Sequence, residues 1–104
     1  MYVRVDVDSS QVTLEEPGNC TQFHVVAAGQ DGQVSAQDLA PHLGAVGSVA
    51  DDDHLWISID EVRRMAAGRV PDGWEAEFDG MVAYATSKGW LDDGGTALRA
   101  HIET

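Results

Sequence analysis

The residues of this chain that could carry chemistry are four histidines, one cysteine and eighteen carboxylates. Histidine titrates near neutral pH, and a cysteine beside a histidine is a common nucleophilic pair. The chain contains no nucleophile-elbow pattern, phosphate-binding glycine loop or dinucleotide fingerprint. A Cys/His pair or an acid–base site would have to be assembled in space from separate segments. The sequence therefore leaves enzyme activity undecided and favours a role other than catalysis.

One segment resembles half of a calcium-binding loop. Residues 31–38 match the second half of an EF-hand loop, with aspartate at both ends and glycine at the second position. The first half is missing, because Ala27 and Gly29 stand where two carboxylates are required. Calcium takes six to eight oxygen ligands, so a glycine turn that leads into a helix is the better interpretation of this segment.

Two other groupings contain metal-binding residue types. Residues 51–53 are three aspartates followed by His54, but adjacent side chains of an extended chain point to opposite sides and do not converge on one ion. Cys20 and His24 are four residues apart on a predicted strand, where the usual rise separates them by about 13 Å. We therefore predict no bound metal and no cofactor.

The charge of the chain limits its partners. Its 104 residues include eighteen acidic and six basic side chains, for a net charge of −12. Phosphate backbones and anionic membranes recruit proteins through basic patches, so we predict no nucleic-acid and no membrane partner. No apolar run approaches a membrane span, and the first residues alternate rather than form a signal peptide. We predict a cytoplasmic protein with a single domain, residues 1–104.

Alternation of apolar and polar residues predicts five strands. The clearest is the first, in which Val3, Val5 and Val7 share one face. A turn at 8–10 joins it to the second strand as a hairpin. The predicted strands are 2–8, 11–15, 21–28, 54–59 and 98–103.

Capping residues predict two short helices. Ser35 and Asp38 compete as the N-cap of the first, and Pro41 favours Asp38, because proline is tolerated in a first turn but not in a helix interior. Residues 44–53, which contain glycines and three aspartates, are predicted to be a solvated loop. Ser58 and Glu61 match a capping box at the start of the second helix.

A third helix has the strongest periodicity in the chain. It begins after Asp72 and stops at Gly89, with acidic residues in its first turns and Lys88 in its last, as the helix dipole favours. Its apolar residues fall within an arc of about 100°. The stripe consists of Trp74, Phe78, Met81, Val82 and Ala85.

Together these elements predict an α+β fold. We expect a two-layer sandwich in which a mainly antiparallel, four- or five-stranded sheet carries two or three helices on one face. The other face of the sheet would then be open. Alternation in four strands places on it Tyr2, Asp6, Gln22 and five candidate binding residues: Arg4, His24, Trp56, Arg99 and His101.

Two functions are compatible with this open face. The first is a small accessory or protein-interaction module whose partner is a second copy of the chain, as a homodimer, or another protein. Trp56 would anchor that contact, since tryptophan is common at the energetic centres of interfaces, whereas Trp74 belongs to the core. The second is a small enzyme or small-molecule-binding protein that uses His24, His101 and Trp56 in a cleft.

Overall fold

The computed structural model of the chain describes residues 1–29 and 34–103. Its strands are β1 (Tyr2–Asp6), β2 (Gln11–Glu15), β3 (His24–Ala28), β4 (Gly47–Asp51), β5 (His54–Ser58) and β6 (Ala97–Glu103). Its helices are α1 (Ala36–Leu39), α2 (Ile59–Ala66) and α3 (Trp74–Ser87), with two 3-10 turns, η1 (Ala40–His42) and η2 (Gly44–Val46).

The six strands of the described residues form one mixed sheet in the order β2-β1-β3-β6-β5-β4. The pairs β1–β2, β4–β5 and β5–β6 are antiparallel, whereas β1–β3 and β3–β6 are parallel. The α+β class is confirmed. The predicted sheet of four or five mainly antiparallel strands is corrected to six strands with two parallel pairings. Alternation reports which residues face the core, but it carries no information about the direction of the neighbouring strand.

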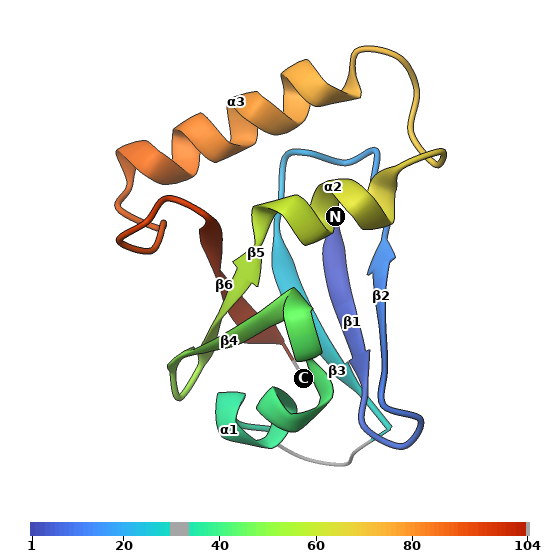
Figure 1. Cartoon of the computed structure of the whole chain (residues 1–104), viewed down its shortest axis with the longest axis vertical. Helices are drawn as coiled ribbons and strands as arrows, with labels where there is room; N and C mark the ends of the chain where they lie inside the picture. The colour runs from blue at the N-terminus through green and yellow to red at the C-terminus, as the bar shows by residue number, and fades with distance from the viewer. Residues whose placement is uncertain (30–33, 104) are drawn as a thin grey trace.

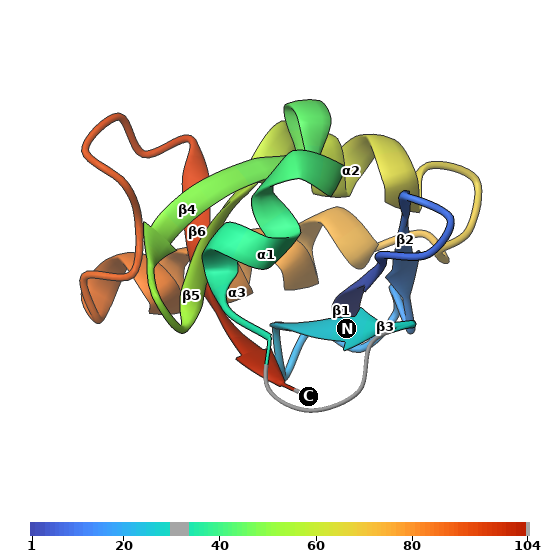
Figure 2. The ribbon, with the colours of Figure 1, turned by 90° about the horizontal axis from the view of Figure 1, so that it is seen from below.

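The sheet is bent into two wings that meet at β3 and β6. These strands pair at only two positions, Val25 with Ile102 and Val26 with Glu103, whereas β5 and β6 pair at five. Figure 1 shows β1, β2 and β3 running side by side, with β4, β5 and β6 crossing them. α1 and α2 lie within the bend, while α3 crosses one end of the molecule (Figure 1 and Figure 2). The helices therefore do not form the single layer of the predicted sandwich.

The core is filled by the apolar residues that alternate along the strands. Val3, Val5, Val25, Leu55 and Ile57 are completely buried. Their neighbours in β1, β3 and β5, among them Arg4, His24 and Trp56, lie on the opposite side of the sheet and are only partly buried. The predicted faces of these strands are confirmed, because alternation follows directly from the pleat.

Residues 44–53, predicted to be a solvated loop, contain η2 and the edge strand β4. The sequence of β4, GSVAD, consists mostly of small residues with little contrast between its two faces, so periodicity does not reveal it. Pairing with β5 explains why it forms. A Cβ on Gly47 would lie 2.3 Å from the carbonyl oxygen of Trp56, so the close approach of the two strands requires glycine there.

The start of α1 also differs from the prediction. Ser35, and not Asp38, is the N-cap: Ser35 Oγ accepts a bond from the Asp38 amide (3.4 Å), and the Asp38 carboxylate accepts one from the Ser35 amide (3.1 Å). Pro41 does not oppose this cap because α1 ends after four residues and the proline falls in η1. At α2, Ser58 is the N-cap as predicted, and its Oγ accepts from the Glu61 amide.

α3 confirms the predicted third helix. Trp74 and Phe78 are buried and stacked, with ring centroids 4.8 Å apart, and Trp74 Nε1 donates to the Pro17 carbonyl. The N-cap is Gly73 at φ 90°, where a glycine is favoured, so the helix begins after Asp72 as predicted. Trp74 is therefore a core residue, as predicted. In the described part of the chain, no helix combines the length and apolar character needed to cross a membrane.

Candidate functional site

The structure places all five candidate residues on the outer face of the sheet, which is the side away from the buried core. Arg4 and His24 lie on the wing formed by β1 and β3. Arg4 pairs with Asp6 across 3.7 Å. The ring of His24 stacks on Tyr2 at 5.2 Å, and its Nε2 lies 3.3 Å from Glu103. Both side chains thus have nearby partners within the sheet.

Trp56, Arg99 and His101 lie on the other wing. Trp56 is directly opposite Arg99, and His54 is directly opposite His101, in the β5–β6 pairing. Trp56 nevertheless borders a separate hollow of about 290 Å³, with Ser48 among its lining residues. The structure brings Arg99 and His101 together in one hollow and places His24 and Trp56 elsewhere. His24 lies on the neighbouring strand β3, where its ring reaches Glu103, two residues along β6 from His101.

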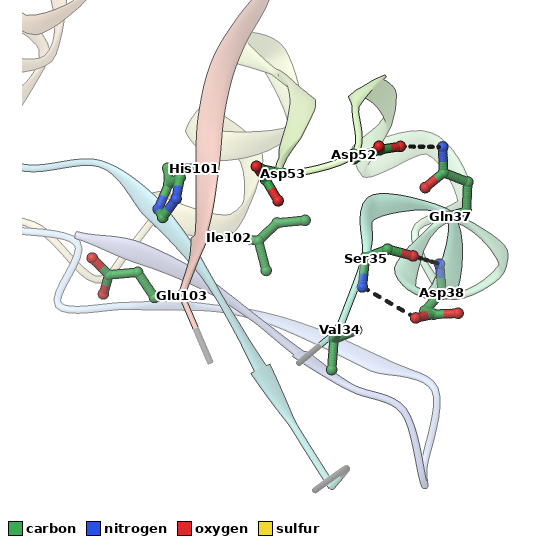
Figure 3. Close-up of a pocket in the computed structure, with 9 residues that line it drawn as sticks. All are labelled: Val34, Ser35, Gln37, Asp38, Asp52, Asp53, His101, Ile102 and Glu103. Carbon is green, nitrogen blue, oxygen red and sulfur yellow. Dashed lines mark hydrogen bonds between the residues drawn. The ribbon is translucent and has the colours of Figure 1, made fainter. Parts of the chain in front are cut away.

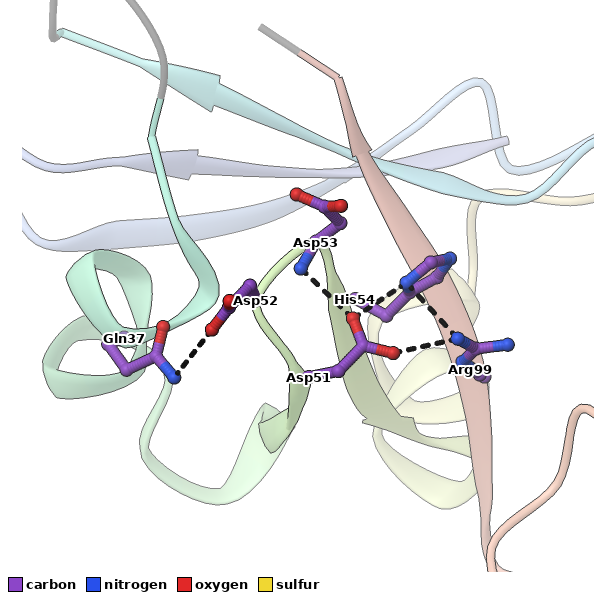
Figure 4. A network of polar contacts seen from close by, with 6 residues as sticks. All are labelled: Gln37, Asp51, Asp52, Asp53, His54 and Arg99. Carbon is purple, nitrogen blue, oxygen red and sulfur yellow. Dashed lines mark hydrogen bonds and ion pairs between the residues drawn. The ribbon is translucent and has the colours of Figure 1, made fainter.

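A polar network joins the end of β4 to β5 and β6 (Figure 4). Arg99 Nη2 donates to Asp51 Oδ2 at 2.7 Å, and His54 Nδ1 donates to Asp51 Oδ1 at 2.8 Å. Arg99 Nη2 also lies 3.4 Å from His54 Nδ1. From the sequence, Asp51 is predicted in a loop and His54 at the start of a strand, with no contact between them expected. Their contact depends on the β4–β5 hairpin, which the sequence pattern did not reveal.

Asp51 organises this network electrostatically. The hydrogen bonds from Arg99 and then His54 lower the pKa of the Asp51 carboxyl well below its ordinary value. Nδ1 of His54 carries the proton of the hydrogen bond to Asp51. In the neutral ring, Nε2 is therefore the nitrogen with a free lone pair, and it is the one that can act as an acceptor. His101 completes the group, with its ring edge-to-face against His54 at 5.3 Å. The arrangement can therefore bind an anion or orient a histidine as a base.

This network borders a groove beside β6, which we call the β6–α3 groove. It consists of a hollow of about 230 Å³ next to the histidines and a hollow of about 100 Å³ next to α3, which share Phe23, Trp90 and Arg99. Trp90 is held beside β6 because its carbonyl accepts a bond from the Arg99 amide at 2.8 Å. The side chains of the groove used below are Phe23, His54, Met81, Tyr84, Trp90, Arg99 and His101.

The α3 end of the groove is aromatic and exposed. Tyr84 is 57% exposed and Trp90 is 41% exposed, and they are the exposed large hydrophobic side chains among the described residues. Their rings contact each other edge-to-face at 5.9 Å, and the Lys88 ammonium lies 5.5 Å from the Tyr84 ring. Sequence reasoning missed Trp90. It follows the helix stop at Gly89 and belongs to no periodic segment, so only its exposure singles it out.

A larger hollow, of about 950 Å³, is an acidic cleft beside the ends of α1 and β6 (Figure 3). The Asp52 carboxylate accepts a hydrogen bond from the Gln37 side chain, and the Asp38 carboxylate accepts one from the Ser35 amide. Positions 31–33 of the calcium-loop match lie outside the described residues. Within residues 1–29 and 34–103, no three His, Cys, Asp or Glu side chains are grouped so that they could hold a metal ion. The carboxylates that line the cleft are Asp38, Asp52, Asp53 and Glu103.

The chain was compared with known families, curated proteins and solved structures, and none of the three comparisons gives a match. The geometry of the outer face and the groove therefore carries the functional argument.

Proposed function

We propose that this chain is a protein-interaction module that binds a partner protein through the β6–α3 groove. The observation that carries the proposal is the position of Tyr84 and Trp90, the two exposed large hydrophobic side chains of the described residues, in contact with each other at this groove. Tryptophan, tyrosine and arginine are the residue types most often found at the energetic centres of interfaces. Arg99 lies beside Trp90, so all three types are present.

The exposed aromatic area is large enough to support binding. Trp90 exposes 41% of a side chain of about 250 Å², so covering it removes ~100 Å² from water and contributes ~2.5 kcal/mol. The exposed 57% of Tyr84 contributes a comparable amount, ~3 kcal/mol, on the same basis. This gross gain must exceed the cost of association, so further contacts with the outer face are required. Arg99 and His101, which lie next to Trp90, would supply them.

Crosslinking tests the proposal. A photo-crosslinking amino acid is placed at position 84 in the cells that make the protein, so that a partner bound at the groove becomes covalently attached. The partner identified in this way is then purified, and its affinity for the wild-type chain is measured by calorimetry. We expect Trp90→Ala to weaken that binding at least tenfold, since ~2.5 kcal/mol corresponds to more than one factor of ten. The melting temperature of Trp90→Ala should stay within a few degrees of the wild type.

The matched control is Trp56→Ala. Trp56 lies on the same outer face but borders a different hollow, so its loss should change the affinity less than threefold. Sedimentation of the wild type across a dilution series shows whether the partner is a second copy. Equal affinities of the wild type and Trp90→Ala would refute the groove as the docking surface, and a larger effect of Trp56→Ala would assign the anchor to Trp56.

A second candidate function is a small enzyme or small-molecule-binding protein. The Asp51–His54 pair favours it, because a carboxylate that holds Nδ1 of a histidine orients Nε2 as a base. Under this alternative the crosslinker at Tyr84 traps no protein, and native mass spectrometry of the purified chain shows a bound small molecule. His54→Gln should then abolish retention of that molecule, whereas His42→Gln, at the distant Ser10 contact, should not.

A further inference from the structure

The described lining of the β6–α3 groove lacks the acidic side chains that dominate the chain as a whole. The sequence has three acidic residues for each lysine or arginine, yet the titratable side chains that line the two hollows of the groove are Arg99, His54, His101 and Tyr84, with no carboxylate among the described lining residues. Asp51 bonds to both Arg99 and His54, so its carboxylate balances the charge of the guanidinium (Figure 4).

Arg99 has hydrogen-bonding capacity left for a ligand. Its Nη2 is used by Asp51, whereas Nε and Nη1, which together carry three N–H groups, make no hydrogen bond within the described residues. The side chain is 37% exposed. His101 is exposed and contacts His54 edge-to-face. It lies between the groove and the acidic cleft, since it lines hollows of both. A guanidinium presented in this way binds carboxylates with strong, directional hydrogen bonds.

The apolar part of the groove lies directly beside these donors. Phe23 and Trp90 line both hollows, and Met81 and Tyr84 are among the further residues that line the smaller one. The volume of that hollow, about 100 Å³, is roughly three times the 30 Å³ that a water molecule occupies, so it accommodates one aliphatic side chain. Because Arg99 also lines both hollows, a ligand that fills them has its carboxylate next to its apolar group.

From this juxtaposition we infer that the β6–α3 groove recognises a segment of the partner protein in which an apolar side chain is adjacent to a carboxylate side chain. The apolar side chain lies between Met81, Tyr84 and Trp90, and the carboxylate accepts bonds from Arg99 and His101. The inference rests on the proposed function. A polyanion such as nucleic acid is not the occupant, because the net charge of −12 repels it, whereas a single carboxylate encounters mainly the local donors.

Short peptides test the chemistry without knowledge of the partner. The probes are acetyl-Gly-Leu-Asp-Gly-amide and acetyl-Gly-Asp-Leu-Gly-amide, each with an asparagine counterpart, titrated to tens of millimolar against ¹⁵N-labelled protein. We expect at least one acidic peptide to shift the indole signal of Trp90 and to bind at least fivefold more tightly than its asparagine counterpart. Arg99→Gln should remove this preference.

The matched control is Arg64→Gln, since Arg64 is an exposed arginine paired with Glu61 outside the groove and its loss should leave the preference unchanged. Equal binding of acidic and asparagine peptides, or a preference that survives Arg99→Gln, overturns the inference. N-acetylleucine that binds as tightly as the best peptide overturns it in favour of a small carboxylic acid. If Trp90→Ala still weakens partner binding at least tenfold while the peptides show no preference for acid, the proposed function stands and only the carboxylate inference fails.

Discussion

Replacing Phe78 with alanine separates the buried face of α3 from its exposed face. Phe78 is completely buried, stacks on Trp74 at 4.8 Å and lies under the Arg63 guanidinium at 5.2 Å. A buried Phe→Ala change costs about 3–5 kcal/mol through lost transfer energy and the cavity that remains. Stacking between the two rings contributes about 0.5–1.5 kcal/mol more to the stability of the wild type. We therefore expect a loss of ~4 kcal/mol in the free energy of unfolding.

That loss is a large share of the stability of a chain this size. The free energy of unfolding of a single domain is about 5–15 kcal/mol. Phe78→Ala should therefore remain folded but lose a quarter or more of its stability. With an m-value of about 1–3 kcal/mol/M, the urea midpoint should fall by ~2 M. The assay is urea denaturation followed by circular dichroism, with linear extrapolation to zero denaturant.

The control on the same helix is Tyr84→Ala. Tyr84 is 57% exposed, so its loss should change the free energy of unfolding by less than about 1 kcal/mol. Met81 is half-buried, so the loss of stability in Met81→Ala should lie between the losses in Phe78→Ala and Tyr84→Ala. The apolar stripe in the sequence alone would predict equal losses for Met81 and Phe78. If Phe78→Ala does not fold, Phe78→Leu, which fills more of the site, should lose less than about 2 kcal/mol. Similar losses for Phe78→Ala and Tyr84→Ala would refute the packing described for α3.

Three further predictions concern strand pairing, the polar network and charge. Gly47→Ala should lower the free energy of unfolding by about 1–3 kcal/mol, because the new Cβ would meet the Trp56 carbonyl. Gly80→Ala should raise it by about 0.5–1 kcal/mol, because the position lies in mid-helix with open space around it. Chemical denaturation of the two variants checks these opposite signs. The pKa of Asp51, followed by carboxyl ¹³C NMR, should lie below its ordinary value of about 3.9 and rise towards it in Arg99→Gln; an unchanged value would contradict the network. Because the folded-state pKa is the lower one, the contribution of Asp51 to stability is present above pH ~4 and is lost as the pH falls through the folded value. Duplex DNA at physiological salt should show no mobility shift with low-micromolar protein, and a salt-sensitive shift would contradict the charge argument.

Local patterns in the sequence determined most of the elements and their faces. Alternation placed Val3 and Val5 in the core and Arg99 and His101 on the outer face, because successive side chains of a strand point to opposite sides whatever the strand pairs with. Helical periodicity likewise identified Trp74 as a core residue. These features depend on neighbouring residues alone, so a single sequence contains them.

Tertiary structure decided the features that depend on which segments meet. β4 forms because β5 offers it a pairing edge and Gly47 permits close approach, which no periodicity within GSVAD could indicate. Its hairpin with β5 is what brings Asp51 to His54, and the β6 pairing adds Arg99. The parallel pairings and the bend at β3 and β6 also depend on contacts between residues far apart in the chain.

The β6–α3 groove shows the same division. The sequence placed Arg99 and His101 on one face of a strand, but Trp90 belongs to no pattern and reaches the groove through the bond between its carbonyl and the Arg99 amide. Tyr84 and Phe23 come from two further segments that lie beside β6 only in the folded chain. Periodicity can state which way a side chain points relative to its own strand or helix. It cannot state which side chains from other elements stand next to it, because that is set by packing between elements.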